Sequence, residues 1–427
     1  MVFLNLLTLK LFTLNNYSRI RNVYRLSVFV FALAGSLSAT ERIYLFDRKN
    51  DDKFINKIIS VIHDSNACLI TNQSTLGKYL FKRVTGDLSY LHKLLKKKNI
   101  NLIKIFSAEH GLSSQEEEDG NDQISIINPD IKVNSINRRT IKEMKVLYGG
   151  CDVVIFDLPD VGIRPYTYRT ILTRTIEALA QLEKVRFVLI DYPNPASFMS
   201  QLPPVANEKY FSYLGEQVIP FFPGYTYAEI TRYYISKRAL SLNTSYLILP
   251  SYRPGYFKEY ETILPPSPAL PHKRALNCYW IGIFFEATTI DYGRYSKDPF
   301  CVIGHPDFDL SKEISGIENI DLSPFVYQPS SGAYKNKLIP GYRIVIKDVK
   351  KLNALKTAYQ LIKYFNMNYP RSNFLIKYQK TFKLDLITGS DSMSSALINN
   401  APFKLWIRTE KKIINKFNKE MKTFRLY

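Results

Sequence analysis

Four apolar runs in the first half of the chain each end in a polar loop. They lie within residues 66–75, 100–111, 151–162 and 185–195. Continuous apolar runs are typical of parallel strands that are covered on both faces. Helical patterns at residues 77–97 and 168–182 separate these runs. The repeated order of strand, loop and helix predicts an α/β fold built on an open, Rossmann-like parallel sheet.

The pattern changes from about residue 252. A proline-rich crossing at residues 264–273 is followed by mixed segments and by helical patterns at residues 352–365 and 393–417. A chain of 427 residues is too long for one ordinary core. We therefore expect a Rossmann-like domain at residues 55–251, a smaller α+β domain at residues 252–427, and a cleft between the two.

The first 39 residues have the pattern of a secretory signal. Arg19, Arg21 and Arg25 precede an apolar stretch, residues 26–39, that ends in small residues. This stretch is shorter than the roughly 20 apolar residues that span a membrane comfortably. The sequence predicts export to the periplasm or the medium, with a retained N-terminal membrane anchor as the alternative.

The net charge limits the classes of partner to expect, and the cysteine content bears on disulfide bonds. The net charge of +20 favours an anionic partner, but the chain has no zinc-finger, RNA-binding or basic-zipper pattern, so we expect no nucleic-acid partner. The four cysteines are far apart in the sequence. Cys68 and Cys151 are interpreted as small buried apolar residues, and a disulfide framework is not expected in a chain of this length.

Polar residues follow each predicted strand closely. In open α/β sheets, ligands bind outside the carboxyl ends of the strands. The residues in these positions are Asn72, Glu109, Asp157, Asp160 and Asn194. We expect them to meet along one edge of the sheet.

Glu109 and His110 form the first candidate site. A carboxyl group beside an imidazole on a loop at a strand end can act as an acid or a base. The alternative is an ordinary pair of solvated loop residues.

Residues 157–168 contain a second candidate site, with Asp160 in a turn and Arg164, Tyr166 and Thr167 leading into a helix. Arg164 is suited to bind a carboxylate of a ligand through two hydrogen bonds. Alternatively, Asp160 and Arg164 pair with each other and brace the loop.

Three further residues have two interpretations each. Asn194, between two prolines, either contacts a ligand or belongs to a rigid turn. Glu286 ends an apolar run and Arg294 follows it. A buried acid needs a partner, so Glu286 either has a catalytic role or forms a structural ion pair with Arg294. The chain lacks the GxSxG, Walker A, GxGxxG and HExxH motifs, and its five scattered histidines do not readily form a metal site, so carboxylate acid–base chemistry is the most economical enzyme mechanism.

From Ala67 onward the chain resembles one family, the NamZ-type exo-β-N-acetylmuramidases, which were long catalogued as a domain of unknown function. The blocks that carry the resemblance are LITNQS, FSAEHG, DVVIFDLPDVGIRPYTY, VLIDYPNP, YTYAEI, LPPSPALP, GIFFEATT, YGRYSKDPF and GYRIVI, in this order. The resemblance implies a Rossmann-like domain joined to a smaller C-terminal domain, with the active site in the cleft. It also implies removal of β-linked N-acetylmuramic acid from the non-reducing ends of peptidoglycan fragments, without a cofactor.

The resemblance also implies roles for individual residues. Glu109 falls on the glutamate that is taken as catalytic. The other residues on family blocks, which would line the pocket, are Asn72, His110, Asp160, Arg164, Tyr166, Thr167, Asn194 and Glu286. We expect Glu109 to be the general acid, with His110 adjusting its proton affinity and with Glu286 or Asp160 as the second carboxyl group. Arg164 would bind the lactyl carboxylate of muramic acid.

Several blocks depart from the family pattern. HGMT is replaced by Pro223-Gly224-Tyr225-Thr226, PSPN ends in Ala269, FEGTN ends in Thr289, and GRGT continues with Tyr295 and Ser296. The loss of two asparagines and a histidine removes expected hydrogen bonds to the sugar, each worth about 1–3 kcal/mol in a buried site. A weakened enzyme, or an inactive protein that binds anionic cell-wall glycans, is therefore the alternative.

Overall fold

A computed structural model describes residues 42–44, 59–72, 74, 100–114, 123–124, 131–199, 202–248, 266–372 and 374–427. The predicted signal segment, the predicted helix at residues 77–97 and the acid-rich loop at residues 116–119 lie outside these residues. All described residues belong to one compact unit, Ala39–Tyr427. None of the helices in the described ranges is long and apolar enough to cross a membrane. The boundary near residue 252 and the cleft stay predictions.

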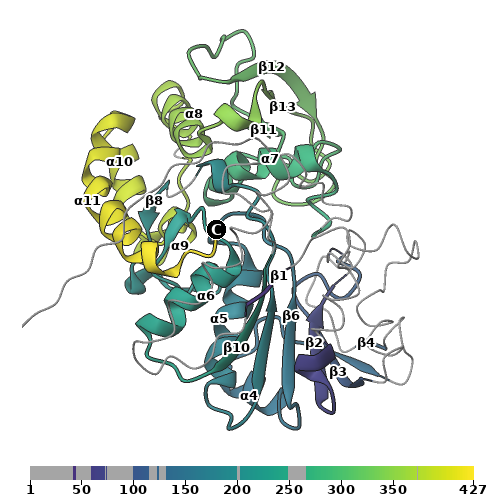
Figure 1. Ribbon diagram of the computed structural model, residues 1–427. Coiled ribbons are helices and arrows are strands. Elements are labelled where there is room, and N and C mark those ends of the chain that lie inside the picture. Colours follow the sequence, from purple (N-terminus) through teal and green to yellow (C-terminus); the bar gives the residue numbers. More distant parts are fainter. Residues whose placement is uncertain are drawn as a thin grey trace, which may run out of the picture. The chain divides into compact units, whose positions relative to one another are not determined.

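The central element is an eight-stranded sheet (Figure 1). Its order is β1 (Arg42–Tyr44), β10 (Asn243–Ile248), β7 (Arg186–Ile190), β6 (Val153–Asp157), β2 (Asn66–Thr71), β3 (Asn101–Ser107), β5 (Lys132–Ser135) and β4 (Gln123–Ile124). All neighbouring pairs are parallel except β4 with β5, which places an antiparallel strand at one edge. The four strands predicted from apolar runs, β7, β6, β2 and β3, are adjacent in the sheet, which confirms the Rossmann-like fold class.

Both faces of the sheet are covered, as the continuous apolar runs require. Val154 and Phe156 of β6 belong to the large core, which also contains side chains of the helices that pack beside the sheet (Figure 1). These helices are α4 (Ile141–Leu147), α5 (Thr167–Leu179) and α6 (Tyr227–Lys237). Val153 and Ile155 point to the opposite face and pack in a second core with residues 59–62. Side chains alternate between the faces of a strand, so neither face of β6 is exposed to water.

The C-terminal part is a smaller α+β arrangement, as predicted. Its helices are α7 (Lys273–Gly282), η4 (Ile283–Ala287), α8 (Ala354–Asn368), α9 (Lys383–Thr388), α10 (Ser392–Ile398) and α11 (Phe403–Met421). Its strands are β11 (Val302–Gly304), β12 (Ile320–Tyr327) and β13 (Ile339–Ile346), which form an antiparallel sheet, and the short hairpin of β14 (Lys377–Tyr378) and β15 (Thr381–Phe382). The hairpin of β8 (Leu202–Val205) and β9 (Pro220–Phe222) contacts α11 through β8.

The prediction of one continuous helix at residues 393–417 is wrong, because two helices, α10 and α11, occupy this stretch. Asn400 has a φ of 53°, a left-handed conformation that cannot continue an α-helix, and Pro402 caps the start of α11. The chain therefore turns between α10 and α11.

Two disulfide bonds overturn the expectation of free, buried cysteines. Cys68 of β2 is bonded to Cys151, which lies just before the neighbouring strand β6, with the Cα atoms 5.9 Å apart. Cys278 of α7 is bonded to Cys301 beside β11, with a Cα separation of 5.1 Å. The prediction failed because it relied on spacing in the sequence, whereas disulfide formation depends on spacing in the fold.

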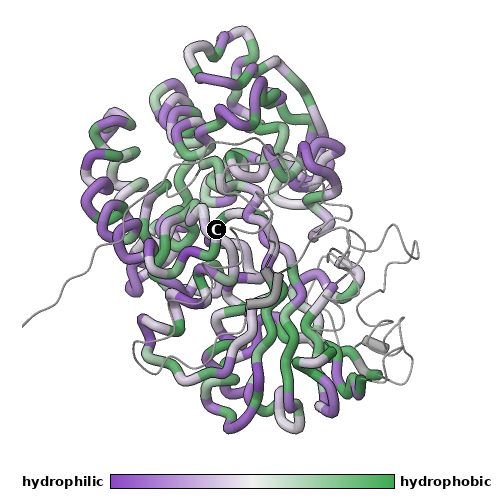
Figure 2. The backbone as a smooth tube through the Cα atoms, in the orientation of Figure 1, coloured by the Kyte–Doolittle hydropathy of each residue, from purple (hydrophilic) through white to green (hydrophobic). Residues whose placement is uncertain are grey.

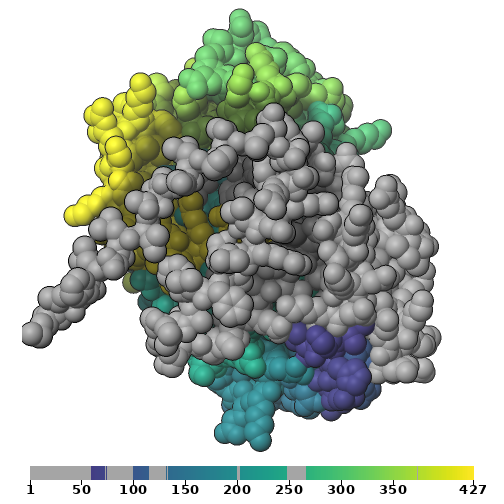
Figure 3. All heavy atoms as spheres, in the orientation of Figure 1, coloured from purple at the N-terminus to yellow at the C-terminus, as the bar shows by residue number. Residues whose placement is uncertain are grey.

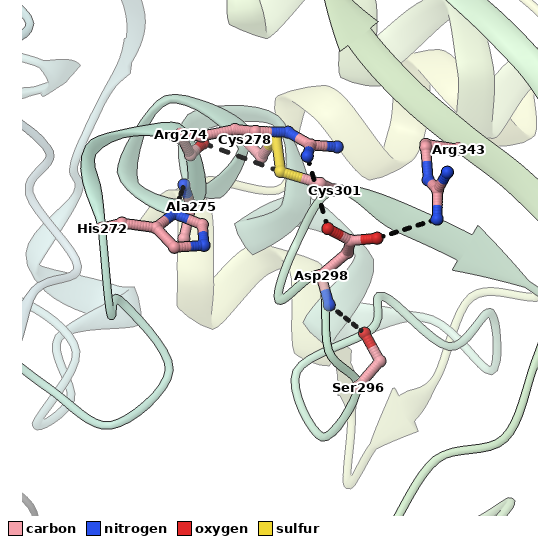
Figure 4. The surroundings of a disulfide bond; sticks show 8 residues. All are labelled: His272, Arg274, Ala275, Cys278, Ser296, Asp298, Cys301 and Arg343. Atoms are coloured by element: carbon pink, nitrogen blue, oxygen red, sulfur yellow. Dashed lines mark hydrogen bonds and ion pairs between the residues drawn. A yellow bond between two sulfur atoms is a disulfide. The ribbon is translucent and has the colours of Figure 1, made fainter.

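The second disulfide lies beside a group of charged side chains (Figure 4). Asp298 lies between Arg274 and Arg343, with N–O distances of 3.4 and 3.0 Å. The loop between α7 and β11 is thus held both covalently and by ion pairs.

Candidate functional site

The carboxyl ends of the central strands bring the predicted polar residues together. Asn72 follows β2, Glu109 follows β3, Asp160 follows β6 and Asn194 follows β7. These four strands are adjacent and parallel, so the residues lie along the same edge of the sheet. The predicted clustering at this edge is confirmed, and the contacts of each residue show how it is used there.

Glu109 lies at the N-terminus of α5. The hydroxyl of Thr167, the first residue of this helix, donates a hydrogen bond of 2.5 Å to Oε2 of Glu109. A helix N-terminus favours negative charge through its free N–H groups and its macrodipole. Glu109 is only partly buried, and its Oε1 accepts no hydrogen bond from the described residues. One carboxyl oxygen is therefore held by Thr167, while no described residue binds the other.

The turn that carries Glu109 is made by two left-handed residues. His110 has a φ of 72° and Gly111 a φ of 70°. A left-handed conformation is uncommon outside glycine and is often found at functional sites. The turn buries the imidazole of His110 while Glu109 remains accessible, so the two residues are not a solvated loop pair.

Glu286 is the second carboxyl group near Glu109. Burial raises the pKa of Glu286, the charges of Arg294 and Lys383 oppose the rise, and the negative charge of Glu109 adds to it. The two glutamates are thus close enough to interact electrostatically. The expected Glu286–Arg294 ion pair is present, with an N–O distance of 3.7 Å.

Tyr279 is a residue of this site that the sequence analysis missed. Burial raises its pKa well above the usual range, and the negative charges of Glu286 and Glu109 contribute to the rise. Its hydroxyl makes no hydrogen bond to the described residues, and its ring packs on Phe300 at a centroid distance of 4.7 Å. The available signal was helical spacing, because Tyr279 precedes Glu286 by seven positions, two helical turns.

Asp160 does not pair with Arg164, contrary to one expectation. Its partner is Arg169 of α5, and the backbone N–H of Gly162 donates a second hydrogen bond of 2.9 Å. Burial raises the pKa of Asp160 and the charge of Arg169 opposes this. The Asp160 side chain is 0% exposed, so it has no free surface with which to reach a sugar oxygen. Glu286 is the better placed of the two carboxyl groups proposed as the partner of Glu109.

The position of Arg164 does not support the predicted contact with a substrate carboxylate. Its Nη2 donates a hydrogen bond of 2.7 Å to the carbonyl of Ile387, and burial, with the charge of Arg169, lowers its pKa to about 9. Its Nε and Nη1 are buried without a partner. Gly215 and Gly389 lie close to the guanidinium. A Cβ added at Gly215 would lie 2.1 Å from its Nη1, and one added at Gly389 would lie 2.9 Å from its Nη2. The hydrogen bond that Arg164 makes is therefore to the protein backbone, and two of its nitrogens remain unpaired among the described residues.

Tyr166 and Asn72 connect the sheet edge to the proline-rich segment. The hydroxyls of Tyr166 and Tyr168 both donate to the carbonyl of Pro266, at 3.2 and 2.8 Å. Nδ2 of Asn72 donates to the Tyr168 hydroxyl at 2.6 Å, and its Oδ1 accepts two bonds from Ser74. These groups position the loops around Glu109, and Tyr168 joins Tyr279 as a residue that the sequence analysis missed.

Asn194 has the contacts of a turn residue. Its Nδ2 donates to the carbonyl of Tyr225 at 2.9 Å, and its Oδ1 accepts from the N–H of Ala196 at 2.8 Å. The side chain is 1% exposed. The interpretation of Asn194 as part of a rigid turn fits these contacts better than contact with a ligand does.

A groove of about 760 Å³ lies elsewhere, between α5, α6 and α11. None of the ten residues predicted for the site lines it. Six of its charged residues form ion pairs with each other, namely Arg174 with Glu216, Lys237 with Glu420 and Arg238 with Glu177. The groove is therefore not the site of the predicted carboxyl chemistry.

Comparisons with known proteins show the family and the fold of this chain. The family models for the N-terminal and C-terminal parts of the exo-β-N-acetylmuramidase NamZ match residues 67–274 and 277–427. The chain is 25% identical over 370 residues to the peptidoglycan β-N-acetylmuramidase NamZ of Bacillus subtilis (strain 168), which covers 84% of this chain and 86% of the relative.

Two crystal structures of DUF1343 family proteins from Bacteroides fragilis share the fold. One has a TM-score of 0.73 at 19% identity and the other a TM-score of 0.66 at 22% identity. Each comparison covers 87% of this chain and 96% of the other chain. With both family models matched in order along most of its length, the chain belongs to the NamZ family of exo-β-N-acetylmuramidases.

Proposed function

We propose that this protein is a glycoside hydrolase that releases β-linked N-acetylmuramic acid from the non-reducing ends of peptidoglycan fragments. The observation that carries the proposal is the position of Glu109, which is held by Thr167 at the N-terminus of α5 and interacts electrostatically with Glu286. The relative from Bacillus subtilis, named a peptidoglycan β-N-acetylmuramidase, supports the choice of substrate.

Glu109 acts as the general acid in this mechanism. Its Oε1, which accepts no bond from the described residues, donates a proton to the glycosidic oxygen as the bond to the leaving sugar breaks. Thr167 holds Oε2 and so fixes the direction in which Oε1 points. His110, buried next to Glu109, keeps the turn in its left-handed conformation.

Glu286 acts on the other side of the sugar ring. In most glycosidases a second carboxylate either attacks the anomeric carbon or activates a water molecule, at separations of about 5–5.5 Å or about 6.5–9.5 Å between the two carboxyl groups. The positive charge of Arg294 favours the ionised form of Glu286, because it opposes the rise in pKa that burial causes. Every proton transfer in this mechanism is made by these side chains, so it requires no metal and no organic cofactor.

The two disulfide bonds support an exported protein. Disulfides form and persist in oxidising compartments such as the periplasm and the extracellular medium. The predicted signal segment at residues 1–39 leads to the same proposal, with attachment to a membrane if that segment is retained. Peptidoglycan fragments would be met in either location.

Turnover of a chromogenic β-N-acetylmuramide tests the proposal. We expect the wild-type protein to release N-acetylmuramic acid and Glu109→Gln to lose at least about 100-fold in kcat, the usual contribution of a general acid. Glu183→Gln, at an exposed carboxyl group outside the site, is the matched control and should keep full activity. Equal turnover by wild type and Glu109→Gln would remove Glu109 from the mechanism.

The second candidate is an inactive protein that binds anionic cell-wall glycans. The observation that favours it is the replacement of family asparagines and a histidine at Ala269, Thr289 and Pro223. Calorimetry with muropeptides, followed by analysis of the products, separates the two functions. Saturable binding without a released sugar would favour the binding protein, and rapid hydrolysis would exclude it.

A further inference from the structure

The outward face of α11 is strongly basic. The helix buries Trp406, Phe417 and Met421 against the rest of the protein, and it also buries Glu410. The exposed residues on the other side include Lys404, Arg408, Lys411, Lys412, Lys416 and Lys419, with Lys422 directly after the helix. Glu420, the other acid of the helix, is paired with Lys237 at 2.8 Å. The exposed face, here called the basic face, thus carries seven positive charges and no exposed carboxylate.

These charges form one continuous stripe. Their successive spacings are four, three, one, four, three and three residues, which at 3.6 residues per turn keeps them within about 140° around the helix axis. At a rise of 1.5 Å per residue, the stripe from Lys404 to Lys422 is about 27 Å long. Helix α11 is predominantly hydrophilic in Figure 2, and Figure 3 shows C-terminal residues, in yellow, at the surface.

Only the C-terminal part of the stripe, with Lys419 in the last turn, suits the helix macrodipole. Lys404, Arg408, Lys412 and Lys416 follow each other at intervals of four residues, a spacing at which like charges repel. Lys404 also lies in the first turn, where the macrodipole disfavours a positive charge. Folding alone therefore does not account for this distribution.

The basic side chains also lack close ion-pair partners among the described residues, although the charges of Lys404 and Lys416 lower the pKa values of Glu318 and Glu420. None of the seven forms an ion pair within the part of the chain that the structure describes. Lysines elsewhere do, such as Lys356 of α8 with Glu318 and Lys347 with Asp321, both at 2.7 Å. The positive charge of the basic face is available to an external anion.

We propose that the basic face is a docking surface for polymeric peptidoglycan, whose stem peptides present carboxylates at repeated positions along an extended strand. This inference rests on the proposed function, because it names the polymer that carries the fragments to be cleaved. A linear stripe of cations fits an extended polyanion better than it fits a single small anion. Docking would raise the concentration of the enzyme near chain ends that its active site can reach.

A membrane surface fits the basic face less well. Leu405, 54% exposed, is the apolar side chain within the stripe, and Ile413, 49% exposed, lies at its margin and lines the groove beside α11. Interfacial helices insert a broad apolar face between lipids, whereas the apolar face of α11 is buried in the protein.

Sedimentation with insoluble peptidoglycan tests the docking surface. One variant replaces five charges of the basic face with glutamine, at Lys404, Arg408, Lys412, Lys416 and Lys419. The matched control removes five charges that are exposed at scattered positions, namely Lys142, Lys184, Lys335, Lys337 and Lys350. Both variants have the same net charge, so only the position of the charges differs.

We expect wild type and the control to sediment with peptidoglycan equally well and the α11 variant to bind about tenfold more weakly or worse, since five screened contacts act together. Binding by wild type should fall as salt is added. Turnover of a soluble chromogenic substrate by the α11 variant should equal that of wild type, which shows that the variant is folded.

Three results would overturn the docking surface. The first is sedimentation of both variants at the level of wild type. The second is an equal loss of sedimentation in both variants relative to wild type. The third is wild-type binding to anionic lipid vesicles or to duplex DNA that is as tight as its binding to peptidoglycan. The proposed function fails separately. If wild type has no turnover but its sedimentation still depends on the basic face, the hydrolase is excluded and the docking surface stands.

Discussion

The hydroxyl of Thr167 donates a hydrogen bond of 2.5 Å to Oε2 of Glu109 and so connects the first residue of α5 to the turn after β3. Thr167 does not act on the substrate itself in this arrangement but positions the acid. Thr167→Val keeps the shape of the side chain and removes the hydroxyl. We expect kcat to fall about 10- to 100-fold, because a small misplacement of a catalytic group has effects of this size, while KM changes little.

Thr167→Ser is the control for this prediction, since serine restores the hydroxyl at the same place. Turnover of the chromogenic substrate by both variants, with thermal unfolding to verify folding, checks it. A loss of activity that serine does not rescue would indicate a packing defect and would remove the positioning role.

The sequence was sufficient to predict the sheet and the edge at which the polar residues meet. Apolar runs report burial on both faces of a strand, and parallel neighbours must end at the same edge. It was not sufficient to predict which partner each side chain chooses there. Asp160 could reach either Arg164 or Arg169 by spacing alone; the fold pairs it with Arg169 and places Arg164 between Gly215 and Gly389.

The disulfides and Tyr279 were missed for a related reason. Cys68 and Cys151 become neighbours only when β2 and β6 pair in the sheet. Tyr279 looked like one more residue of an apolar helical run, and its relation to the two glutamates depends on how α7 packs.

Arg294 sets the ionisation of Glu286. Burial raises the pKa of Glu286, and the charge of Arg294 lowers it. Arg294→Gln removes the opposing charge, so the pKa of Glu286 should rise further. Since the proposed mechanism needs ionised Glu286, the acidic limb of the kcat/KM profile should move to higher pH.

The pH profile of the chromogenic reaction, measured for wild type and Arg294→Gln, checks this prediction. A matched variant, Arg371→Gln, removes an exposed charge that is not among the cations acting on Glu286 and should leave the profile unchanged. If Arg294→Gln moved the alkaline limb of the profile instead of the acidic limb, Glu286 would be the general acid and Glu109 the ionised carboxylate.

Asp160 and Arg169 are a buried ion pair that braces the loop leading into α5. Asp160→Asn leaves the charge of Arg169 buried without a carboxylate, a change that typically costs about 3–5 kcal/mol. We expect the free energy of unfolding, measured in urea, to fall by this amount. If Asp160 were catalytic instead, the variant would lose activity while keeping its wild-type stability.

The disulfide between Cys68 and Cys151 closes a loop with a sequence separation of 83 residues. Loops of this size lose entropy in the unfolded chain worth about 4–5 kcal/mol, and the shorter loop closed by Cys278 and Cys301 about 3 kcal/mol. The double variant Cys68→Ala/Cys151→Ala should therefore unfold at lower urea concentration than Cys278→Ala/Cys301→Ala. Unfolding of both under oxidising conditions checks the order, and added reductant should destabilise wild type but not a variant without all four cysteines.

Asp157 makes stability depend on pH near neutrality. It is buried at the end of β6, and burial raises its pKa from the ordinary value of 3.8 to about 7, although the Tyr192 hydroxyl donates to it and opposes the rise. Between these two values the folded protein holds a proton that the unfolded chain has released. The free energy of unfolding therefore falls as the pH rises from about 4 to about 7, by at most about 4 kcal/mol from this group. Asp157→Asn cannot ionise and keeps an acceptor for Tyr192, so it should lose less stability than wild type between pH 5 and pH 8.

Urea unfolding at the two pH values measures this difference, with Glu183→Gln as the control at an exposed carboxyl group. The pH dependence of Asp157→Asn should be smaller but not zero, because Asp191 at the end of β7 is also buried and burial raises its pKa to about 7. If wild type and Asp157→Asn lost the same stability from pH 5 to pH 8, Asp157 would already be ionised in the folded protein at pH 5, and its burial would not be the cause of the pH dependence.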